Sequence, residues 1–461
     1  MSVLLNDVLA DLGMVDVGDL VVTGDPRPAV LSSSLAVADC AVASVAASLI
    51  AAADLALART GSRPDVGLDT GHVAAAVRSE VLLRAPTGHA MSGFAPLSRL
   101  WPAADGWVRT HANYPWHRAA LLAALGVAVG PDADVEMRLA HAIAERRALE
   151  VEQRVYEAGG LAVAARTAAQ WAAGEPGRAV AAQSLVVTEL LRTGAPPLAE
   201  SGALPGSGLR VLDLTRVIAG PVATRMLGAL GADVLRVDDP HRPELPLHAV
   251  DGVIGKASTT VDATTVHDLE VLHGLLDAAD VLVTGYRPGA LRKFGLDPDQ
   301  VADQHPGTVV VSLSAWGALG PWGARRGFDS LVQIASGIGW ATSADGSRPG
   351  ALSCQLLDHA TGYLVEAGAL TALARRARTG QTTHVRFSLA RTAQWLLEQG
   401  LRSGVRSGSQ EVVERDAAYR IPLGNGWNSI APPGHLDGKP LTWPHLPPRY
   451  AQSAPTWART S

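Results

Sequence analysis

A single aspartate stands where the sequence predicts the start of a long helix. Asp358 lies in the run L-L-D-H-A-T-G (356–362), and helical apolar spacing continues from it to about Ala377. A carboxylate in this position can cap the first backbone N–H groups of the helix. It can also act as a nucleophile toward an acyl group, because the same N–H groups would stabilise the oxyanion that forms. The residues alone favour the helix cap.

The motifs of several common enzyme classes are absent from the sequence. It contains no P-loop pattern, no G-x-S-x-G serine elbow, no H-E-x-x-H and no pair of C-x-x-C motifs. Its two cysteines, Cys40 and Cys354, are too few for a disulfide framework or a thiolate cluster. We therefore predict no metal site. The turn D-L-T-R-V-I-A-G-P (213–221) lacks G-x-G-x-x-G, which disfavours a dinucleotide site, although the helix that begins at Gly220 could face an anion.

Composition and charge exclude several broad classes. The 461 residues are 47% hydrophobic and 18% charged, which is typical of a globular protein of two or three domains. With 39 Lys and Arg against 44 Asp and Glu, the chain has no basic excess for nucleic acid. The segment Met1–Leu20 has no basic start like that of a signal peptide, and the apolar stretch Cys40–Ala53 is too short to cross a bilayer. We expect a cytoplasmic protein with no membrane partner.

The elements that must position Asp358 lie mostly in residues 209–403. Short β-branched runs alternate there with helical stretches, and the predicted strands are Arg210–Leu214, Val234–Val237, Asp280–Val283 and Val309–Leu313. This alternation predicts an α/β fold with a doubly wound parallel sheet, in which ligands bind beyond the carboxyl ends of the strands. Residues 194–208 are rich in Gly, Pro and Ser and predict a linker, whereas residues 404–461 predict an irregular tail rich in Gly, Pro and Trp.

An ungapped repeat relates the two halves of the chain. The motif A-D-C-A (38–41) corresponds to L-D-H-A (357–360), and A-R-T-G (58–61) recurs at 377–380. Asp39 and Asp358 are 319 positions apart, as are Val66 and Val385. One shared tetrapeptide could arise by chance, but the constant offset favours internal duplication.

An ordered series of motifs runs through the second half of the chain, and it begins with G-L-R-V-L-D-L-T-R-V-I-A-G-P (208–221). Further runs follow in order: L-G-A-L-G-A-D-V-L-R-V-D (227–238), G-K-A-S-T-T-V-D (255–262), A-D-V-L-V-T-G-Y-R-P-G-A-L-R-K-F-G-L (279–296), S-L-S-A-W-G-x-x-G-P (312–321), G-F-D (327–329) and L-L-D-H-A-T-G (356–362). Together these runs resemble the family III CoA-transferases, which include formyl-CoA transferase, carnitine CoA-transferase and α-methylacyl-CoA racemase. The resemblance covers about 190 residues without a break.

The first half resembles the remaining part of the same family. The stretch Asp39–Val66 repeats the helix of the catalytic aspartate, and A-D-G-W-V (104–108) with W-H-R-A-A-L-L-A-A-L-G (116–126) looks like the small domain. The resemblance implies a Rossmann-like domain plus a smaller mixed α+β domain, interlocked as in the family's two subunits. Residues 1–193 would be a partial copy from the carboxyl part and 209–403 one from the amino part. The chain either completes one interlocked unit by itself or forms a homodimer.

The resemblance also implies roles for individual residues. Asp358 would be the nucleophile, and CoA would be held by Arg216, Val217, Lys256, Arg287 and Lys293. Basic side chains suit the three phosphates of CoA. The sequence departs from the family pattern at Gly285, where the family has asparagine, and at Asp239, where a basic residue is frequent. Asp39 would be a helix cap or a vestige.

The expected function is transfer of CoA from an acyl-CoA to a small carboxylic acid through an aspartyl mixed anhydride and an aspartyl-CoA thioester. The CoA thioester is then a substrate, and no cofactor is expected to stay bound. Two alternatives stay open: a catalytically silent acyl-CoA-binding or scaffold protein, and an acyl-CoA isomerase or racemase-like enzyme with Asp358 as base. Phe328 stands where the racemases carry histidine, which disfavours racemisation by the family mechanism, because phenylalanine moves no proton.

Overall fold

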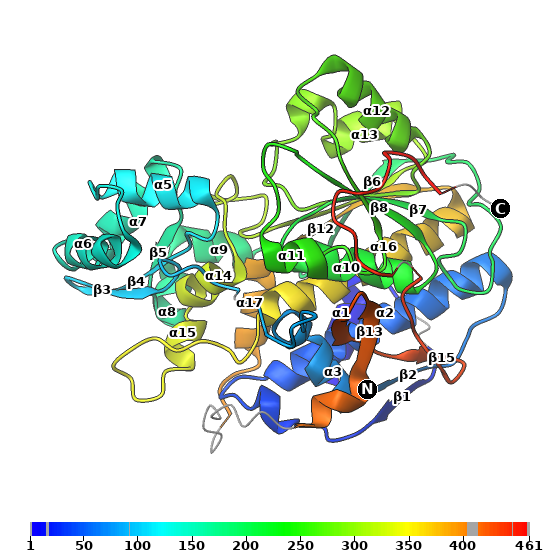
Figure 1. Ribbon diagram of the computed structural model, residues 1–461. Helices are drawn as coiled ribbons and strands as arrows, with labels where there is room; N and C mark the ends of the chain where they lie inside the picture. Colours follow the sequence, from blue (N-terminus) through cyan, green and yellow to red (C-terminus); the bar gives the residue numbers. More distant parts are fainter. Residues whose placement is uncertain (1, 15–17, 92, 403–413, 445, 459–461) are drawn as a thin grey trace.

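A seven-stranded sheet forms the centre of the molecule (Figure 1). The computed structural model describes residues 2–14, 18–91, 93–402, 414–444 and 446–458. The strand order is β6 (Val187–Arg192), β12 (Thr382–Ser388), β11 (Val309–Ser314), β10 (Val281–Thr284), β7 (Arg210–Leu214), β8 (Asp233–Asp238) and β9 (Ala257–Thr260). All neighbouring pairs are parallel except β6 with β12. The prediction of a mainly parallel α/β sheet is therefore confirmed.

Alternate residues of each central strand enter two separate cores, as strand geometry requires. Val281 and Val309 pack with the core that contains α10 (Ala219–Ala229) and α16 (Leu356–Thr379). Leu282 and Val310 face the other core, which α12 (Val266–Asp277) and α13 (Pro298–Gln304) cover. Figure 1 shows these two helix layers on opposite faces of the sheet. Both faces are covered, which explains why the strands read as nearly continuous apolar runs.

A smaller unit with its own core lies at the left of Figure 1. Its three antiparallel strands are β3 (Leu100–Ala103), β4 (Gly106–Thr110) and β5 (Ala162–Ala164), and its helices are α5 (Pro115–Ala124), α6 (Asp132–Ala144) and α7 (Ala148–Glu157). Two short helices, α8 (Ala168–Ala173) and α9 (Glu175–Ala181), then lead to β6. Residues before the predicted linker therefore contribute an edge strand to the large sheet.

Two 24-residue helices with the predicted offset pack against each other. They are α2 (Val37–Thr60) and α16, and their bounds differ by 319 positions. Each ends at a left-handed glycine, Gly61 with φ 76° and Gly380 with φ 66°. A strand and a helix follow each of them: β2 (Val66–Asp69) and α3 (Thr70–Ala76) after α2, and β12 and α17 (Leu389–Glu398) after α16.

Helix α2 is longer than the predicted apolar stretch. By length and composition it is the one helix among the described residues that could cross a membrane. In its most apolar window 89% of the residues are buried inside the protein, as in a core helix of a folded protein. Helix α1 (Val3–Asp11) and helix α16 both pack on it.

In a second, small sheet, the neighbours of β2 are arranged like the neighbours of β12 in the large sheet. The order of the small sheet is β1 (Leu20–Thr23), β2, β15 (His435–Leu436) and β16 (Lys439–Pro440). Strand β2 has a parallel neighbour, β1, on one side and an antiparallel neighbour, β15, on the other. Strand β12 has the same two kinds of neighbour, β11 and β6. The remaining strands, β13 (Arg420–Gly424) and β14 (Trp427–Ile430), form a hairpin.

The tail is more regular than its composition predicts, although residues 403–413 lie outside the described part. After β16 it runs to the far edge of the large sheet, where the N–H of Ser453 donates to the carbonyl of Ser258 at 2.8 Å. The indole of Trp443 donates to the carbonyl of Arg225 at 3.2 Å, and that of Trp457 to the carbonyl of Leu275 at 3.0 Å. We call the described residues 441–444 and 446–458 the strap.

The predicted linker is also fixed to the body of the protein. The guanidinium of Arg59, at the end of α2, donates to the carbonyls of Ala199 at 2.7 Å, Pro205 at 2.6 Å and Ser207 at 2.9 Å.

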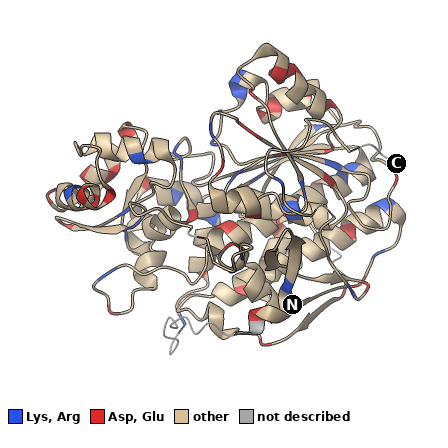
Figure 2. Ribbon diagram, in the orientation of Figure 1, with Lys and Arg blue, Asp and Glu red and all other residues tan. Residues whose placement is uncertain are grey.

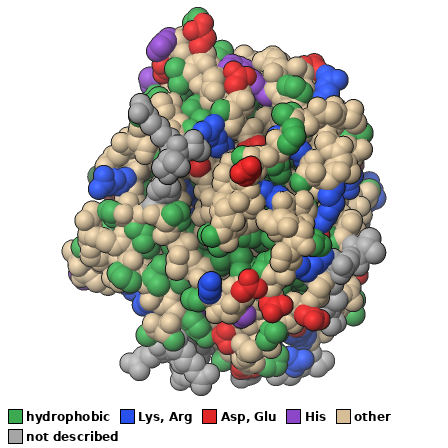
Figure 3. All heavy atoms as spheres, turned by 90° about the vertical axis from the view of Figure 1, so that its right-hand side faces the viewer, with side chains coloured by type: hydrophobic (Ala, Val, Ile, Leu, Met, Phe, Trp, Pro, Cys, Tyr) green, Lys and Arg blue, Asp and Glu red, His purple; other side chains and the backbone are tan. Residues whose placement is uncertain are grey.

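Residues of both charges are dispersed over the elements in Figure 2, and the face shown in Figure 3 carries both signs among hydrophobic side chains. That face therefore offers no single-sign surface for a polyanion.

Candidate active site

A cavity of about 650 Å³ lies between the small unit and the carboxyl ends of the central strands. Tyr114, Trp116 and His117 line it from the first half of the chain. From the second half, residues at or just after the ends of four strands line it: Leu214, Asp238, Gly285 and Ser314. This is the edge of a doubly wound sheet at which ligands are expected. Asp358 is also among the lining residues.

Asp358 is the third residue of α16, and its side chain does not cap the helix. The N-cap position belongs to Gln355, and no side-chain hydrogen bond caps this end. Instead, the backbone N–H of Asp358 donates to Oδ2 of Asp329 at 3.0 Å. Asp329 begins α14 (Asp329–Ser336) and also accepts a bond from the amide of Gln333. The cap favoured by the residues alone is therefore wrong, and the Asp358 carboxylate is left to face the cavity.

Burial and two carboxylates make ionisation of Asp358 unfavourable. Asp358 is only 7% exposed, and burial raises its pKa well above the ordinary value, with Asp329 and Glu80 adding repulsion. Burial likewise raises the pKa of Asp329 to about 6, although the hydrogen bonds from Asp358 and Gln333 oppose the shift. Glu80 comes from α4 (Ser79–Leu82) in the first half and bonds Nε2 of His359 at 2.7 Å.

Basic side chains surround the mouth of the cavity. Six line it: Arg216, Arg242, Arg287, Lys293, Arg325 and Arg326. The side chains of Arg242, Arg287, Lys293 and Arg326 are exposed. Burial lowers the pKa of Arg326, and the neighbouring charges of Arg287 and Arg242 lower it further. Cations that repel one another in this way would be stabilised by a ligand that carries several negative charges.

Four of the five predicted CoA-binding residues lie at the cavity together with Asp358. They are Arg216, Val217, Arg287 and Lys293. Gly285 and Asp239, the two departures from the family pattern, line it as well. A substitution at either place therefore changes the cavity itself.

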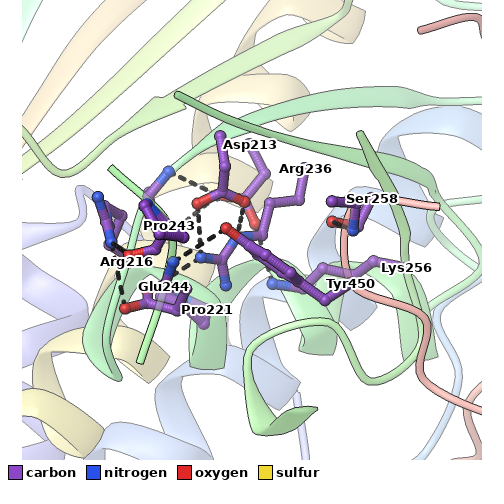
Figure 4. Close-up of polar contacts among 12 residues, drawn as sticks. Asp213, Arg216, Pro221, Arg236, Pro243, Glu244, Lys256, Ser258 and Tyr450 are labelled. Carbon is purple, nitrogen blue, oxygen red and sulfur yellow. Dashed lines mark hydrogen bonds and ion pairs between the residues drawn. The ribbon is translucent and has the colours of Figure 1, made fainter. Parts of the chain in front are cut away.

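Lys256 is the exception, because it does not line the cavity. Its side chain is fully buried, and its Nζ donates to Oδ2 of Asp213 at 2.9 Å and to the hydroxyl of Thr224 (Figure 4). Burial lowers the pKa of Lys256 to about 8, although the carboxylate of Asp213 opposes this shift. Lys256 therefore links Asp213 of β7 to Thr224 of α10 inside the protein.

The turn after β7 is held in an unusual backbone conformation. Val217 has φ 69°, and its N–H donates to Oε2 of Glu244 at 3.1 Å. The guanidinium of Arg216 donates to the carbonyls of Arg242 at 2.7 Å and Pro243 at 2.9 Å. A Cβ on Gly220 would lie 2.2 Å from the Cβ of Thr215, so only glycine allows this close turn. Arg216 therefore lines the cavity and also stabilises the loop that contains Arg242 and Pro243.

Sequence reasoning missed several residues that build the site. Tyr114, His117 and Glu244 carry no local motif, because their partners are distant in sequence. Asp329 could have been found, since it follows Phe328 in the run G-F-D (327–329).

Phe328 stacks on His111, with ring centroids 3.8 Å apart and planes 9° apart. Burial, with the charge of Arg326, lowers the pKa of His117 to about 4, so this imidazole is neutral at pH 7.

Comparison with known proteins assigns the segment that carries this site. Residues 207–425 match the model of the family described as CoA-transferase family III. This segment belongs to that family. The family III segment contains Asp358, Asp329 and all the cavity-lining strand ends of the second half.

Curated relatives of the family III segment are named as CoA-transferases. A probable fatty acyl-CoA transferase from Mycobacterium tuberculosis is 34% identical over 200 residues, which cover 41% of this chain and 51% of that protein. A formyl-CoA:oxalate CoA-transferase from Streptomyces coelicolor is 31% identical over 241 residues, which cover 49% and 58%. A crystal structure of the Mycobacterium tuberculosis protein aligns with a TM-score of 0.40 and 33% identity, covering 43% of this chain and 59% of that one. The chain thus spans about half the length of the curated relatives it matches.

Proposed function

We propose that this chain transfers CoA from an acyl-CoA to a carboxylic acid, with Asp358 as the nucleophile. The observation that carries the proposal is the position of Asp358, a buried carboxylate without a helix-capping bond, in a cavity that six basic side chains surround. The three phosphates of CoA suit those side chains. The CoA thioester is a substrate in this proposal, and no resident cofactor is needed.

Each step exchanges one bond for another at a carbonyl carbon. The Asp358 carboxylate attacks the thioester carbonyl, the C–S bond breaks, and CoA thiolate leaves a mixed anhydride behind. The thiolate then attacks the aspartyl carbonyl, which releases the donor acid and forms an aspartyl-CoA thioester. The acceptor carboxylate attacks this thioester and the thiolate leaves again. Attack of the thiolate on the acceptor carbonyl gives the new acyl-CoA and frees Asp358, with no net change in protons.

We further propose that one chain builds one complete interlocked unit from two partial copies. Three observations support this. The two helix–strand–helix segments keep a constant offset of 319 positions, the cavity takes lining residues from both halves, and β6 of the first half joins the sheet of the second. At the equivalent place of the first copy, the carboxylate of Asp39 is bonded to Arg402 and does not line the cavity. Asp39 is therefore a vestige in this proposal.

A covalent trap tests the nucleophile. The protein is incubated with a panel of acyl-CoA esters and then with hydroxylamine, which converts an aspartyl anhydride or thioester into a hydroxamate. Peptide mass spectrometry locates the product. We expect it at Asp358 in the wild type and in Asp39→Asn, which is the matched control, and not in Asp358→Asn. Detectable binding of the esters without modification of any aspartate would refute the transferase.

The raised pKa of Asp358 favours one second candidate, an isomerase that uses this carboxyl group to move a proton at the α-carbon of an acyl-CoA. Such an enzyme would exchange the α-hydrogen for deuterium in heavy water with no acceptor acid present. Phe328 stands at the position where racemases carry histidine, and its ring stacks on His111. Exchange without an acceptor, together with no hydroxamate at Asp358, would establish the isomerase instead.

A further inference from the structure

One buried carboxylate joins the two walls of the cavity. Glu244 lies in the loop between β8 and α11 (Pro246–Asp251) and is 7% exposed. Its Oε1 accepts a bond from the hydroxyl of Tyr114 at 2.5 Å, and its Oε2 accepts bonds from the N–H of Val217 at 3.1 Å and from Arg236 at 3.0 Å. Figure 4 shows Glu244 among Arg216, Arg236 and Tyr450. Burial opposes ionisation, but the charges of Arg236 and Arg216 hold the pKa of Glu244 well below its usual value.

The bond from Tyr114 crosses between the two halves of the chain. Tyr114 is the N-cap residue of α5 in the small unit, and Glu244 follows a strand of the large sheet, 130 positions later. Tyr114 and Val217 both line the cavity, and they donate to different oxygens of this carboxylate. The guanidinium of Arg216 lies 5.1 Å from the centre of the Tyr114 ring. A single side chain thus fixes the position of one wall relative to the other.

The strap also contacts Glu244, through the hydroxyl of Tyr450. The backbone N–H of Glu244 donates to the hydroxyl of Tyr450 at 3.0 Å. The guanidinium of Arg236 lies 5.7 Å from the centre of the Tyr450 ring. The N–H of Ala451, the next residue, donates to the hydroxyl of Ser258 at 3.0 Å, which ties this part of the strap to β9. Displacement of the Glu244 loop would therefore break contacts on both of its sides.

We propose that Tyr114, Glu244 and Tyr450 form an interdomain latch that sets the width of the cavity for the CoA moiety. These are positioning residues, because they act through Arg216 and Val217 rather than on the reacting carbonyl. The effect of the latch on catalysis rests on the proposed function. The latch also holds the small unit against the turn after β7, and this structural role does not depend on the proposed function.

Removal of one hydroxyl group opens the latch with the smallest change of shape. In Tyr114→Phe, Oε1 of Glu244 keeps the bond from the N–H of Leu245 but loses its donor from the small unit, so the small unit is held less firmly. We expect the dissociation constant of coenzyme A, measured by calorimetry, to rise about 10-fold, the effect of one hydrogen bond to a charged group. In Tyr450→Phe the expected rise is about 3-fold, because only the backbone of the loop is released. KM for the acyl-CoA should rise more than kcat falls, since Asp358 is untouched.

Tyr419→Phe is the matched control. The hydroxyl of Tyr419 also donates to a carboxylate, Oδ1 of Asp69 at 2.6 Å, but it does so beside the small sheet. This variant should bind coenzyme A like the wild type. An unchanged dissociation constant in a folded Tyr114→Phe protein would overturn the latch.

Amide hydrogen exchange separates failure of the latch from failure of the proposed function. Tyr114→Phe should speed exchange in peptides that cover residues 214–222 and 244–252, and Tyr419→Phe should not. If the wild type binds no coenzyme A, the transferase proposal fails while faster exchange still supports the latch. If coenzyme A binds but exchange and affinity are both unaffected by Tyr114→Phe, the latch fails alone.

Discussion

Burial disfavours the ionised form of Asp358, which is the form that a nucleophile needs. The carboxyl groups of Asp329 and Glu80 add to this effect, and the charge of His359 opposes the rise in the pKa of Asp329. Two carboxyl groups that repel each other in a buried site titrate as a pair, so the first proton leaves more easily than the second. Formation of the aspartyl intermediate should therefore become faster as the pH rises.

Replacement of Asp329 tests this coupling. In Asp329→Asn the amide oxygen can still accept the N–H of Asp358, but the negative charge is gone, so the pKa of Asp358 falls. The pH profile of single-turnover hydroxamate formation should move to lower pH, by about one unit or more for a charge in direct contact. Asp345→Asn, in an exposed loop, is the control and should leave the profile in place. A shift to higher pH would contradict the assignment.

The residues also show where prediction from the sequence fails. Asp358 and four of the five predicted binding residues lie at one cavity, because the four follow the ends of β7 and β10 and Asp358 stands at the start of α16. Lys256 does not, because its partner Asp213 is 43 positions away and no local pattern reveals a buried ion pair. Glu244 was missed for the same reason. Its partners come from the small unit, the turn after β7 and the strap.

At the level of elements, local sequence predicts the large sheet well and the small sheet poorly. Val234–Val237 and Val309–Leu313 agree with β8 and β11 to within one residue at each end, because buried parallel strands are nearly uninterrupted β-branched runs. Strands β15 and β16 have two residues each, and β15 pairs with β2 far away in the sequence. Such strands are defined by their partners, so composition alone predicts an irregular tail.

The paired helices carry one buried acid that the proposed reaction does not use. Glu366 of α16 is fully buried, and among the described residues neither carboxylate oxygen has a hydrogen-bond partner. Burial raises its pKa well above the ordinary value, although the nearby hydroxyl of Ser48 on α2 opposes the shift. The residue 319 positions earlier, Ala47, has no such group. The interface between α2 and α16 therefore contains an acid that is most stable when protonated.

Glu366→Gln should stabilise the protein, and more so at higher pH. The folded-state pKa of Glu366 is raised, so the wild type loses stability as the pH rises from the unfolded-state pKa through the folded-state pKa. The loss is about 1.4 kcal/mol per pH unit over that interval, and glutamine does not titrate. Urea unfolding at pH 5 and pH 8 measures the difference. Glu398→Gln, near the end of α17, is the control, and an equal gain at both pH values would argue against the titration.

At the scale of the whole molecule, the site exists only because the two halves fold together. One wall of the cavity, the Glu80 carboxylate whose charge acts on Asp358 and the β6 edge strand all come from residues before the linker. The sequence indicates both halves and their order. It does not indicate how they meet, because contacts such as that between Tyr114 and Glu244 link segments more than a hundred positions apart.

One chain should bind one molecule of coenzyme A. Calorimetric titration should give a stoichiometry of one per chain for the wild type and for Asp39→Asn, because Asp39 does not line the cavity. The molar mass from light scattering shows whether the chain is alone or paired in that experiment. A stoichiometry of two per chain, reduced to one by Asp39→Asn, would show that the first copy keeps a working site.

The pairing of α2 with α16 also has an evolutionary consequence. In a dimer of identical chains, every mutation appears on both sides of the symmetry axis, so a change that helps one site is imposed on the other. Here the two helices are encoded separately. Asp39 can therefore acquire Arg402 as a partner while Asp358 keeps its open cavity. Selection can act on each helix alone, so the two helices are free to diverge.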